Sequence, residues 1–232
     1  MNRVIFEKLD EMKYQTNEVF KTLRTNIQFC GSDVKTIMIT SSIPNEGKSS
    51  VTFDLVRSMA QNNKKVIFID TDMRKSVIHG RYRVGKKVTG LSEYLSGQTE
   101  LKEAIHSTNI ENMYIVLAGQ VPPNPAELLS SVRFQGLLDE LRREYDYVII
   151  DTPPIGCVID AAIVAEKCDG AVIVVESGSV SYKFVQNAKE QIEKSGCKIL
   201  GAILNKIKME DSKHYGKYYG KYYGKYYGHA NG

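Results

Sequence analysis

Six short apolar runs, rich in Ile and Val, recur along the chain and are separated by longer segments whose apolar residues repeat with helical spacing. A strand that is apolar throughout must be buried on both faces, and strands that alternate with helices are typical of a parallel sheet covered by helices on both sides. The sequence therefore predicts an α/β domain over residues 1–207. Its expected strands are TIMIT (36–40), VIFID (66–70), YIVLAG (114–119), YVIID (147–151), AVIVVES (171–177) and ILGAILN (199–205).

Helices are expected in the intervening segments. In residues 17–29, Val19, Leu23 and Ile27 lie four apart and, with Phe20 beside them, form one apolar stripe. The expected helix at 182–196 ends at Gly196, and Gly is the residue that most often ends a helix. The further expected helices are 48–63, short pieces within 91–106, one or two helices within 126–145, 159–167 and 182–196.

The last 25 residues have a composition that no core could use. The unit KYYG occurs three times after a related KHYG, and no aliphatic residue precedes Ala230 after Met209. We therefore expect residues 208–232 to be a disordered tail. The tail holds seven of the 14 tyrosines in the chain: Tyr215, Tyr218, Tyr219, Tyr222, Tyr223, Tyr226 and Tyr227.

The net positive charge of the chain is confined to this end. From Lys206 onward there are six lysines and two acids, which accounts for the whole net charge of +4. The remaining body is neutral, which argues against a domain that binds nucleic acid. A basic tail rich in Tyr and Gly could bind RNA weakly, but we expect no specific nucleic-acid partner.

The sequence also bears on the cellular compartment. The four cysteines form no CxxC pair, so neither a zinc site nor a disulfide framework is indicated, and a reducing cytoplasm is expected. The N-terminus lacks the apolar stretch of a signal peptide, and no apolar run approaches the roughly 20 residues of a membrane helix. A partner could still hold the protein at the inner face of the cell membrane.

A phosphate-binding loop is predicted where the first strand becomes a helix. The stretch SSIPNEGKSS matches GxxxxGK[ST] at Gly47, Lys48 and Ser49, with Ser42 in place of the first Gly. In such a P-loop, backbone N–H groups surround phosphate, the Lys approaches the β- and γ-phosphates, and the Ser hydroxyl binds Mg²⁺. A helix that merely starts with GKS is the alternative. The expected nucleotide-binding residues here are Ser42, Pro44, Asn45, Glu46, Gly47, Lys48, Ser49 and Ser50.

Acidic residues end two of the predicted strands. VIFIDTDMR supplies Asp70 and Asp72, and YVIIDTPP supplies Asp151. Because the carboxyl ends of parallel strands share one edge, where ligands bind, these acids should flank the nucleotide. A single Asp there would more often be a cap or turn residue. With three aspartates, two can support Mg²⁺ and one is left to take a proton from an attacking hydroxyl.

These motifs resemble the Walker A, Walker A′ and Walker B motifs of bacterial tyrosine kinases, the family tied to capsule and exopolysaccharide synthesis. GQVPPNPAELL (119–129) and the closing tyrosine cluster also resemble that family. The resemblance implies an ATP-dependent protein-tyrosine kinase that uses Mg²⁺. It implies that Lys48 holds phosphate, that Ser49, Asp72 and Asp151 support the metal, and that Asp70 is the base. It also implies that Asn205 lies near the adenine, with a plain strand-terminal Asn as the alternative.

The same resemblance implies an assembly. The family pattern ExxRxxR, which mediates ring formation, corresponds here to Glu18, Lys21 and Arg24, with Lys in place of the first Arg. Lys keeps the charge but loses the planar fork of Arg, and a solvated helix face is the alternative. The implied partners are the tail of a neighbouring subunit in a homo-oligomeric ring, the cytoplasmic end of a membrane polysaccharide co-polymerase that acts as activator, and a cognate tyrosine phosphatase.

Two other functions remain open from the residues alone. One is a nucleotide-dependent binding switch of the partitioning or division-site type, and the other is an RNA-associated ATPase. Partitioning ATPases carry a second lysine early in the phosphate loop, at the position of Ile43, and its absence argues against that branch. A basic run at Arg81, Arg83, Lys86 and Lys87 could meet phosphate or a partner, or form a solvated loop.

Overall fold

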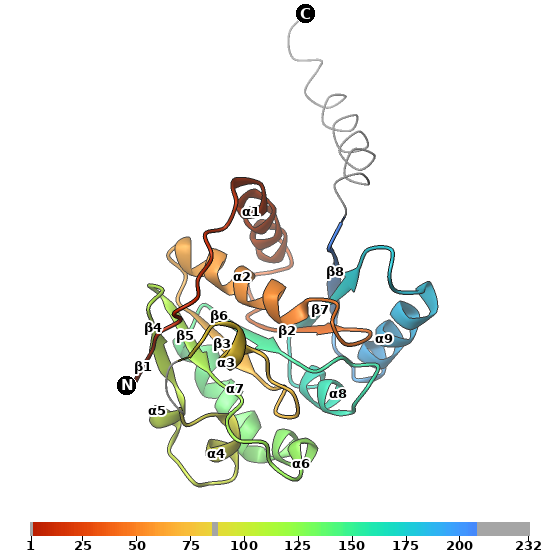
Figure 1. The fold of residues 1–232 in the computed structure, drawn as a ribbon. Helices are drawn as coiled ribbons and strands as arrows, with labels where there is room; N and C mark the ends of the chain where they lie inside the picture. Colours follow the sequence, from red (N-terminus) through yellow and green to blue (C-terminus); the bar gives the residue numbers. More distant parts are fainter. Residues whose placement is uncertain (1, 85–87, 208–232) are drawn as a thin grey trace, which may run out of the picture.

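The computed structural model describes residues 2–84 and 88–207, and in these residues eight strands form one sheet (Figure 1). The order across the sheet is β1-β4-β5-β3-β6-β2-β7-β8. All six predicted strands are present, and the predicted parallel sheet is confirmed for the pairs that join them. The strands are β1 (Asn2–Val4), β2 (Thr36–Ser41), β3 (Val66–Asp70), β4 (His106–Thr108), β5 (Met113–Val116), β6 (Tyr147–Asp151), β7 (Gly170–Glu176) and β8 (Ile199–Asn205).

Helices cover the two faces of this sheet (Figure 1). Helices α1, α2 and α3 pack on one face with Phe53 and Phe68 in the core between them and the strands. On the opposite face, residues of α4, α6, α7, α8 and α9 pack around Phe134. The helices are α1 (Tyr14–Gln28), α2 (Lys48–Gln61), α3 (Ile78–Arg81), α4 (Leu91–Leu95), α5 (Leu101–Ala104), α6 (Pro125–Ser130), α7 (Val132–Glu144), α8 (Asp160–Ala165) and α9 (Tyr182–Lys194).

One edge of the sheet departs from the predicted pattern. Strand β4 pairs antiparallel with β5, and β1 adds to the outer side of β4. The chain between β4 and β5 is only four residues long, whereas a parallel pair needs a crossover of a dozen or more residues. Strands β1 and β4 are three residues each, too short to show a period, so the sequence did not predict them.

The centre of the sheet places three predicted motifs side by side. Strand β6 lies between β3 and β2, and all three run parallel. In this register Asp70 is the partner of Asp151, and Ile39 of β2 is the partner of the same aspartate. The acidic ends of β3 and β6 therefore meet the loop that follows β2 at one edge.

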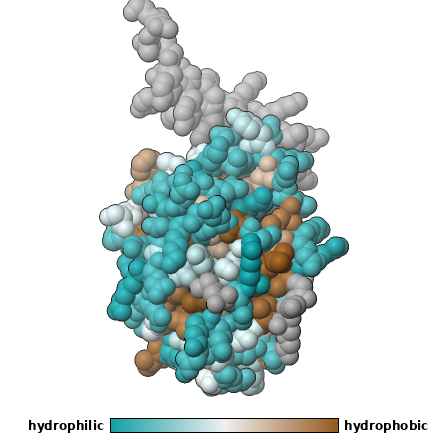
Figure 2. All heavy atoms as spheres, turned by 90° about the vertical axis from the view of Figure 1, so that its left-hand side faces the viewer, coloured by the Kyte–Doolittle hydropathy of each residue, from teal (hydrophilic) through white to brown (hydrophobic). Residues whose placement is uncertain are grey.

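Figure 2 shows the surface of the molecule on the side that carries β1 and β4. This face is mostly hydrophilic, and its hydrophobic areas are small and separate. An extended apolar docking surface of the kind that marks many interfaces is therefore not seen on this side. Among the described residues, the helices all fall short of the length and apolar character that crossing a bilayer requires.

Candidate nucleotide-binding and catalytic site

The loop between β2 and α2 has the conformation of a phosphate cradle. Helix α2 begins at Lys48, and Gly47 caps it in the left-handed region with φ 90°. A Cβ atom at Gly47 would collide with the side-chain amide of Asn205, so the position requires glycine. The N-terminus of this 14-residue helix presents free backbone N–H groups at the cavity, which favours an anion there.

The rest of the loop is fixed by a glutamate and an asparagine that come from opposite directions. The Glu46 carboxylate is buried and accepts hydrogen bonds from the backbone N–H groups of Ile43 (2.8 Å) and Glu176 (3.1 Å). The Asn205 amide donates to the Glu46 carbonyl at 2.9 Å. Glu46 therefore supports the loop from behind, while Asn205, at the end of β8, closes one side of it.

Ser42 occupies the position at which the motif has its first glycine. It is not among the described residues with positive φ, so this loop does not need glycine there. Its carbonyl oxygen packs where a Cβ atom of Gly156 would lie, and its own hydroxyl is buried with no hydrogen-bond partner among the described residues. The serine is thus compatible with the loop.

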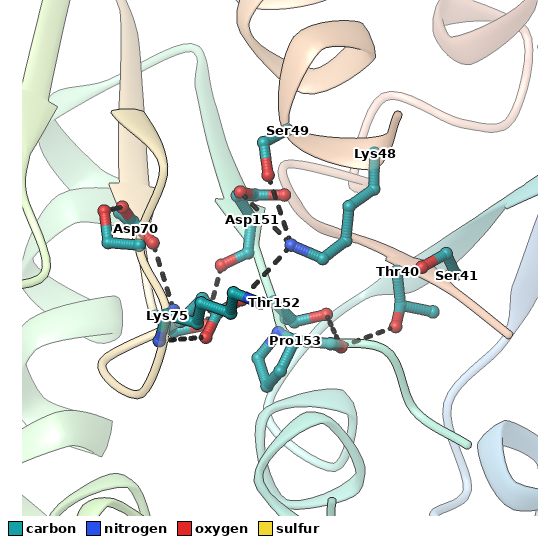
Figure 3. A network of polar contacts seen from close by, with 12 residues as sticks. Thr40, Ser41, Lys48, Ser49, Asp70, Lys75, Asp151, Thr152 and Pro153 are labelled. Atoms are coloured by element: carbon teal, nitrogen blue, oxygen red, sulfur yellow. Dashed lines mark hydrogen bonds and ion pairs between the residues drawn. The ribbon is translucent and has the colours of Figure 1, made fainter. Parts of the chain in front are cut away.

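Lys48 lies at the centre of the acidic residues (Figure 3). Its ammonium is 3.4 Å from Asp72 Oδ2, 3.7 Å from Asp151 Oδ2 and 3.2 Å from Ser49 Oγ. The Thr52 hydroxyl donates to the Lys48 carbonyl at 2.8 Å and lies 3.4 Å from Asp151 Oδ1. The motifs that were separate in the sequence therefore form one cluster of charged groups.

Asp70 stands behind this cluster and is fully buried. One carboxylate oxygen accepts the backbone N–H of Asp72 at 3.0 Å, and the other accepts the hydroxyl of Ser76. Burial, and next the negative charge of Asp151, raise the pKa of Asp70 to about 7. Burial also raises the pKa of Asp151, against the opposing effects of Lys48 and of the Ser49 hydrogen bond. A carboxyl group with a pKa near neutrality is suited to accept a proton.

The loop after β3 is held to helix α8 by an ion pair. The Arg74 guanidinium binds both oxygens of the fully buried Asp160, at 2.7 and 3.1 Å. Hydrogen bonding to this carboxylate raises the pKa of Arg74 further above its usual value. Bidentate pairing fixes the loop that carries Asp72, and it places Arg74 on the wall of the adjacent cavity.

A cavity of about 670 Å³ opens between the loop and the acidic strand ends. Its size lies within the range of roughly 300–1,000 Å³ that is typical of small-molecule sites. The predicted residues Ser42, Glu46, Asp70 and Asp151 are buried behind its surface. Those that line it are Pro44, Asn45, Gly47, Lys48, Ser49, Ser50, Asp72 and Asn205.

The donor groups at this edge fit a magnesium ion. Ser49, Asp72 and Asp151 offer a hydroxyl and two carboxylates, the hard oxygen ligands that Mg²⁺ prefers. No group of three or more His, Cys, Asp or Glu side chains in residues 2–84 and 88–207 is arranged to hold a metal. The protein would therefore share the ion with phosphate oxygens and water, as is usual for Mg²⁺ in phosphoryl-transfer sites.

The predicted interface residues on α1 are also placed by the structure. Lys21 and Glu18 form an exposed ion pair at 2.8 Å. Arg24 instead points toward the body and donates to the Ser58 carbonyl of α2 at 2.8 Å. The seven tail tyrosines lie outside the described residues.

The cavity also includes cations that were not among the predicted site residues. Lys75, Arg81 and Lys206 line it, and Lys206 also binds the Asn45 carbonyl (2.6 Å) and Glu176 (2.9 Å). Arg81 belongs to the basic run, while Lys206 directly follows Asn205. The buried partner Asp160 gave no signal, because an acid in the first turn of a helix is ordinary.

Comparison with known proteins supplies the family. A family model described as an AAA domain matches residues 34–198. The chain is similar to the tyrosine-protein kinase CpsD of Streptococcus agalactiae, with 44% identity over 213 residues, 92% of this chain and 92% of the relative. It is also similar to the tyrosine-protein kinase YwqD of Bacillus subtilis (strain 168), with 40% identity over 90% of this chain and 88% of the relative.

Solved structures give a consistent result. The chimerical protein CapA2B2 superposes with a TM-score of 0.81 at 36% identity, over 88% of this chain and 93% of that one. The kinase domain of the Escherichia coli tyrosine kinase ETK superposes with a TM-score of 0.79 at 37% identity, over 83% and 76%. The septum site-determining protein MinD of Pyrococcus horikoshii OT3, complexed with Mg-ADP, gives 0.64 at 25% identity, over 73% and 69%.

Proposed function

Because this chain belongs to the family of bacterial tyrosine kinases and is a protein-tyrosine kinase, we propose that it transfers the γ-phosphoryl group of ATP to the tyrosines of its own C-terminal cluster. The observation that carries this proposal is where the tail begins. Strand β8 ends at Asn205, and both Asn205 and Lys206 line the nucleotide cavity. The last described residues therefore lie at the rim of the cavity, and the tyrosine cluster follows them in the sequence.

The residues divide the chemistry among them. Lys48 and the N–H groups at the start of α2 bind the phosphates, and Arg74, Lys75 and Arg81 add positive charge along the cavity. Ser49, Asp72 and Asp151 would hold Mg²⁺, which supplies charge neutralisation on the phosphate oxygens when bound. These groups position ATP and stabilise the charge that develops during transfer.

Asp70 completes the reaction as the base. The tyrosine hydroxyl oxygen bonds to the γ-phosphorus while the bond from that phosphorus to the β–γ bridging oxygen breaks. The electron pair of the broken bond leaves with ADP, and the phenolic proton passes to Asp70. A free tyrosine has a pKa near 10, so a carboxylate whose pKa is about 7 can assist its deprotonation.

We also propose that transfer occurs between subunits of a ring. A flexible Gly-rich segment of 20 residues spans roughly 25 Å, enough to leave its own site and enter a neighbouring one. Helix α1 would provide the ring contact through Glu18 and Lys21, which face solvent. Arg24, which binds α2, would instead hold the helix in place.

The cellular role follows from the family resemblance. We propose that the kinase regulates capsular or exopolysaccharide synthesis and export. In this role it is cytoplasmic and is recruited to the inner face of the membrane by the cytoplasmic end of a polysaccharide co-polymerase, which activates it. A cognate tyrosine phosphatase would remove the phosphate groups and reset the tail.

A nucleotide-dependent switch is the second candidate, and the fold shared with a septum site-determining protein favours it. The kinase and the switch differ in the fate of the γ-phosphate of ATP. Purified protein with Mg·ATP should place phosphate on tail peptides, with little release of inorganic phosphate, if it is the proposed kinase. Release of inorganic phosphate with an unmodified tail would instead support the switch.

A further inference from the structure

The N-terminal strap, residues 5–13, connects β1 at one edge of the sheet to helix α1 (Figure 1). The backbone N–H of Phe6 donates to Asn109 Oδ1 at 3.1 Å, and the Asn109 amide donates to the Phe6 carbonyl at 3.3 Å. Further along the strap, the Asp10 carbonyl accepts a hydrogen bond from Arg57 of α2 at 2.9 Å. The strap is therefore held in a defined place against the body.

One side chain of the strap, Phe6, completes an aromatic cluster beneath it. Phe6 is 2% exposed, and its ring meets the ring of Phe53 on α2 edge to face, with 5.0 Å between centroids. Phe6 also makes an edge contact with Tyr82 at 5.8 Å, while Tyr82 and Phe53 are stacked at 3.8 Å. Such aromatic pairs stabilise a fold beyond the area that they bury. The backbone adds to the contact, because the Lys8 N–H donates to the Tyr82 carbonyl at 3.4 Å.

Tyr82 directly follows helix α3, and Arg81 is the last residue of that helix. A helix of four residues is not stable alone in water, because its few hydrogen bonds do not offset the entropy that is lost on ordering a turn. Tertiary packing must therefore fix α3. Its anchors are the buried Ile78 at its start and the stacked ring of Tyr82 at its end. The position of Arg81 thus depends on Tyr82 being held in the aromatic cluster.

Arg81 lines the nucleotide cavity together with Val77, the residue that precedes α3. Its charge also acts on α2: burial raises the pKa of Asp54, and the positive charges of Arg57 and Arg81 oppose that rise. Among the residues that the structure describes, the Arg81 guanidinium forms no ion pair. It is therefore available to a phosphate group in the cavity.

We propose that Phe6 is a positioning residue for nucleotide binding: it holds Tyr82 against α2 and thereby keeps Arg81 at the phosphates of ATP. This inference rests on the proposed function in one respect, namely that Arg81 is one of the cations that bind those phosphates. The strap then belongs to the site although it lines no part of the cavity. Displacing the strap would weaken ATP binding without changing any residue that the nucleotide touches.

The test measures binding of Mg·AMP-PNP, a non-hydrolysable ATP analogue, to the full chain by isothermal titration calorimetry. Phe6→Ala should raise the Kd about tenfold, the factor that corresponds to one lost hydrogen bond between charged groups. Arg81→Ala should raise it by a similar factor. Ile5→Ala is the matched control, because Ile5 is the adjacent strap residue and is 55% exposed, so its Kd should equal that of the parent. A parent-like Kd in Phe6→Ala would overturn the inference.

A double variant separates this route from a general effect on the P-loop helix. Phe53 belongs to α2, which also carries Lys48, so the loss of Phe6 could act through α2 instead. If Phe6 acts through Arg81, adding Phe6→Ala to Arg81→Ala should leave the Kd almost unchanged. Independent effects would multiply to about a hundredfold in the double variant, and that result would also overturn the inference.

Because Phe6→Ala leaves a space in the core, Asn109→Ala provides a second variant that loosens the strap from outside. Asn109 is exposed, and its side chain makes both hydrogen bonds to the Phe6 backbone, so the aromatic rings stay in place. Its Kd should rise about threefold or more. If Phe6→Ala does not fold, Asn109→Ala decides alone, and a parent-like Kd in it rejects the inference.

Failure of the proposed function has a different signature. Binding of Mg·AMP-PNP needs no acceptor, whereas mass spectrometry of tail peptides after incubation with Mg·ATP reports the transfer. A parent chain that binds the analogue and leaves its tail unmodified rejects the proposed function, while the Kd values still decide on Phe6. Tail phosphorylation together with a parent-like Kd in Phe6→Ala rejects the inference alone. A parent chain that does not bind the analogue rejects both.

Discussion

At the scale of single residues, the site is held in a state that costs stability. Asp70 is fully buried beside another carboxylate, and its pKa is raised from 3.8 to about 7. Between these pH values the folded protein keeps a proton that the unfolded chain has already released. The contribution of protonated Asp70 to the free energy of unfolding is therefore fully present at low pH, and it is lost as the pH rises through about 7.

Asp70→Asn should separate this cost from function. The amide is neutral at every pH and can still accept from Asp72 and donate to Ser76. We expect the melting temperature of the variant, relative to the parent, to be higher at pH 8 than at pH 5, while tail phosphorylation is lost. Thermal unfolding without nucleotide at both pH values measures this.

Asp139→Asn on the exposed face of α7 is the control, and it should show no such dependence on pH. An equal difference between Asp70→Asn and the parent at both pH values would contradict the account of Asp70. Retained tail phosphorylation in Asp70→Asn would contradict the role of Asp70 as base.

The motifs allowed several of these residues to be located from the sequence, because spacing along a strand end or loop fixes their approximate place. Lys48, Asp72 and Asp151 were expected together and lie together. The sequence could not show that Glu46 turns away from the cavity or that Asp160 pairs with Arg74. Those contacts depend on side-chain direction and on segments far apart in the chain.

At the scale of elements, α1 is attached to the body through a polar contact on α2. Arg24→Ala removes the hydrogen bond to the Ser58 carbonyl. We expect the free energy of unfolding to fall by about 1 kcal/mol, with a further loss from the packing of the arginine stem. Urea unfolding with an unchanged m-value measures the difference.

Lys21→Ala offers the comparison on the same helix. Its ion pair with Glu18 is exposed on both sides, with 48% and 47% of the side chains accessible. Exposed pairs contribute roughly 0–1 kcal/mol, so the change should be small. An equal loss in the two variants would show that Arg24 does not anchor the helix.

The loop after β3 depends on a different contact, the pair of Arg74 with Asp160. Arg74→Met leaves a fully buried carboxylate without its partner, while Asp160→Asn removes the charge itself. Because 43% of the arginine side chain is exposed and water compensates in part, we expect a loss of about 1–3 kcal/mol for Arg74→Met.

A double-mutant cycle isolates this interaction. The chain with both changes should be more stable than Arg74→Met alone, since no unpaired buried charge remains. Strict additivity of the two single changes, measured by urea unfolding, would contradict the proposed coupling.

Strands and helices were predicted correctly where the apolar pattern extends over several residues. The apolar strands and the existence of helix α1 were predicted, although α1 begins at Tyr14 rather than at residue 17. The predicted stripe was wrong at Val19, which is 63% exposed, because the helix turns the adjacent Phe20 into the core instead. The edge strands β1 and β4 were not, because three residues carry no period and their pairing is decided by tertiary contacts. The antiparallel pair of β4 with β5 likewise follows from a short connection rather than from composition.

At the scale of the whole molecule, the charge of the tail is the variable that phosphorylation changes. Each phosphate adds about −1.5 to −2. Modification of all seven tyrosines would turn the segment from Lys206 onward, of net +4, into one of about −6 to −10. We expect mutual repulsion among such tails to loosen the ring, so that native mass spectrometry finds smaller oligomers for fully phosphorylated protein.

A variant in which all seven tail tyrosines are changed to Phe is the control. Incubated with Mg·ATP, it reports effects of the nucleotide alone, and its oligomers should keep their size. Identical oligomer sizes for unmodified and fully phosphorylated wild-type protein would contradict the charge mechanism.

The central claim is that the cavity around Lys48 phosphorylates the tail. Its most direct test is mass spectrometry of tail peptides from wild-type protein and from Lys48→Met after incubation with Mg·ATP, each with and without the cytoplasmic end of a polysaccharide co-polymerase. Phosphotyrosine should appear within residues 215–227 of the wild type, increase with the activator and be absent in Lys48→Met. A tail that stays unmodified in the activated wild type, or equal modification in Lys48→Met, would contradict the account.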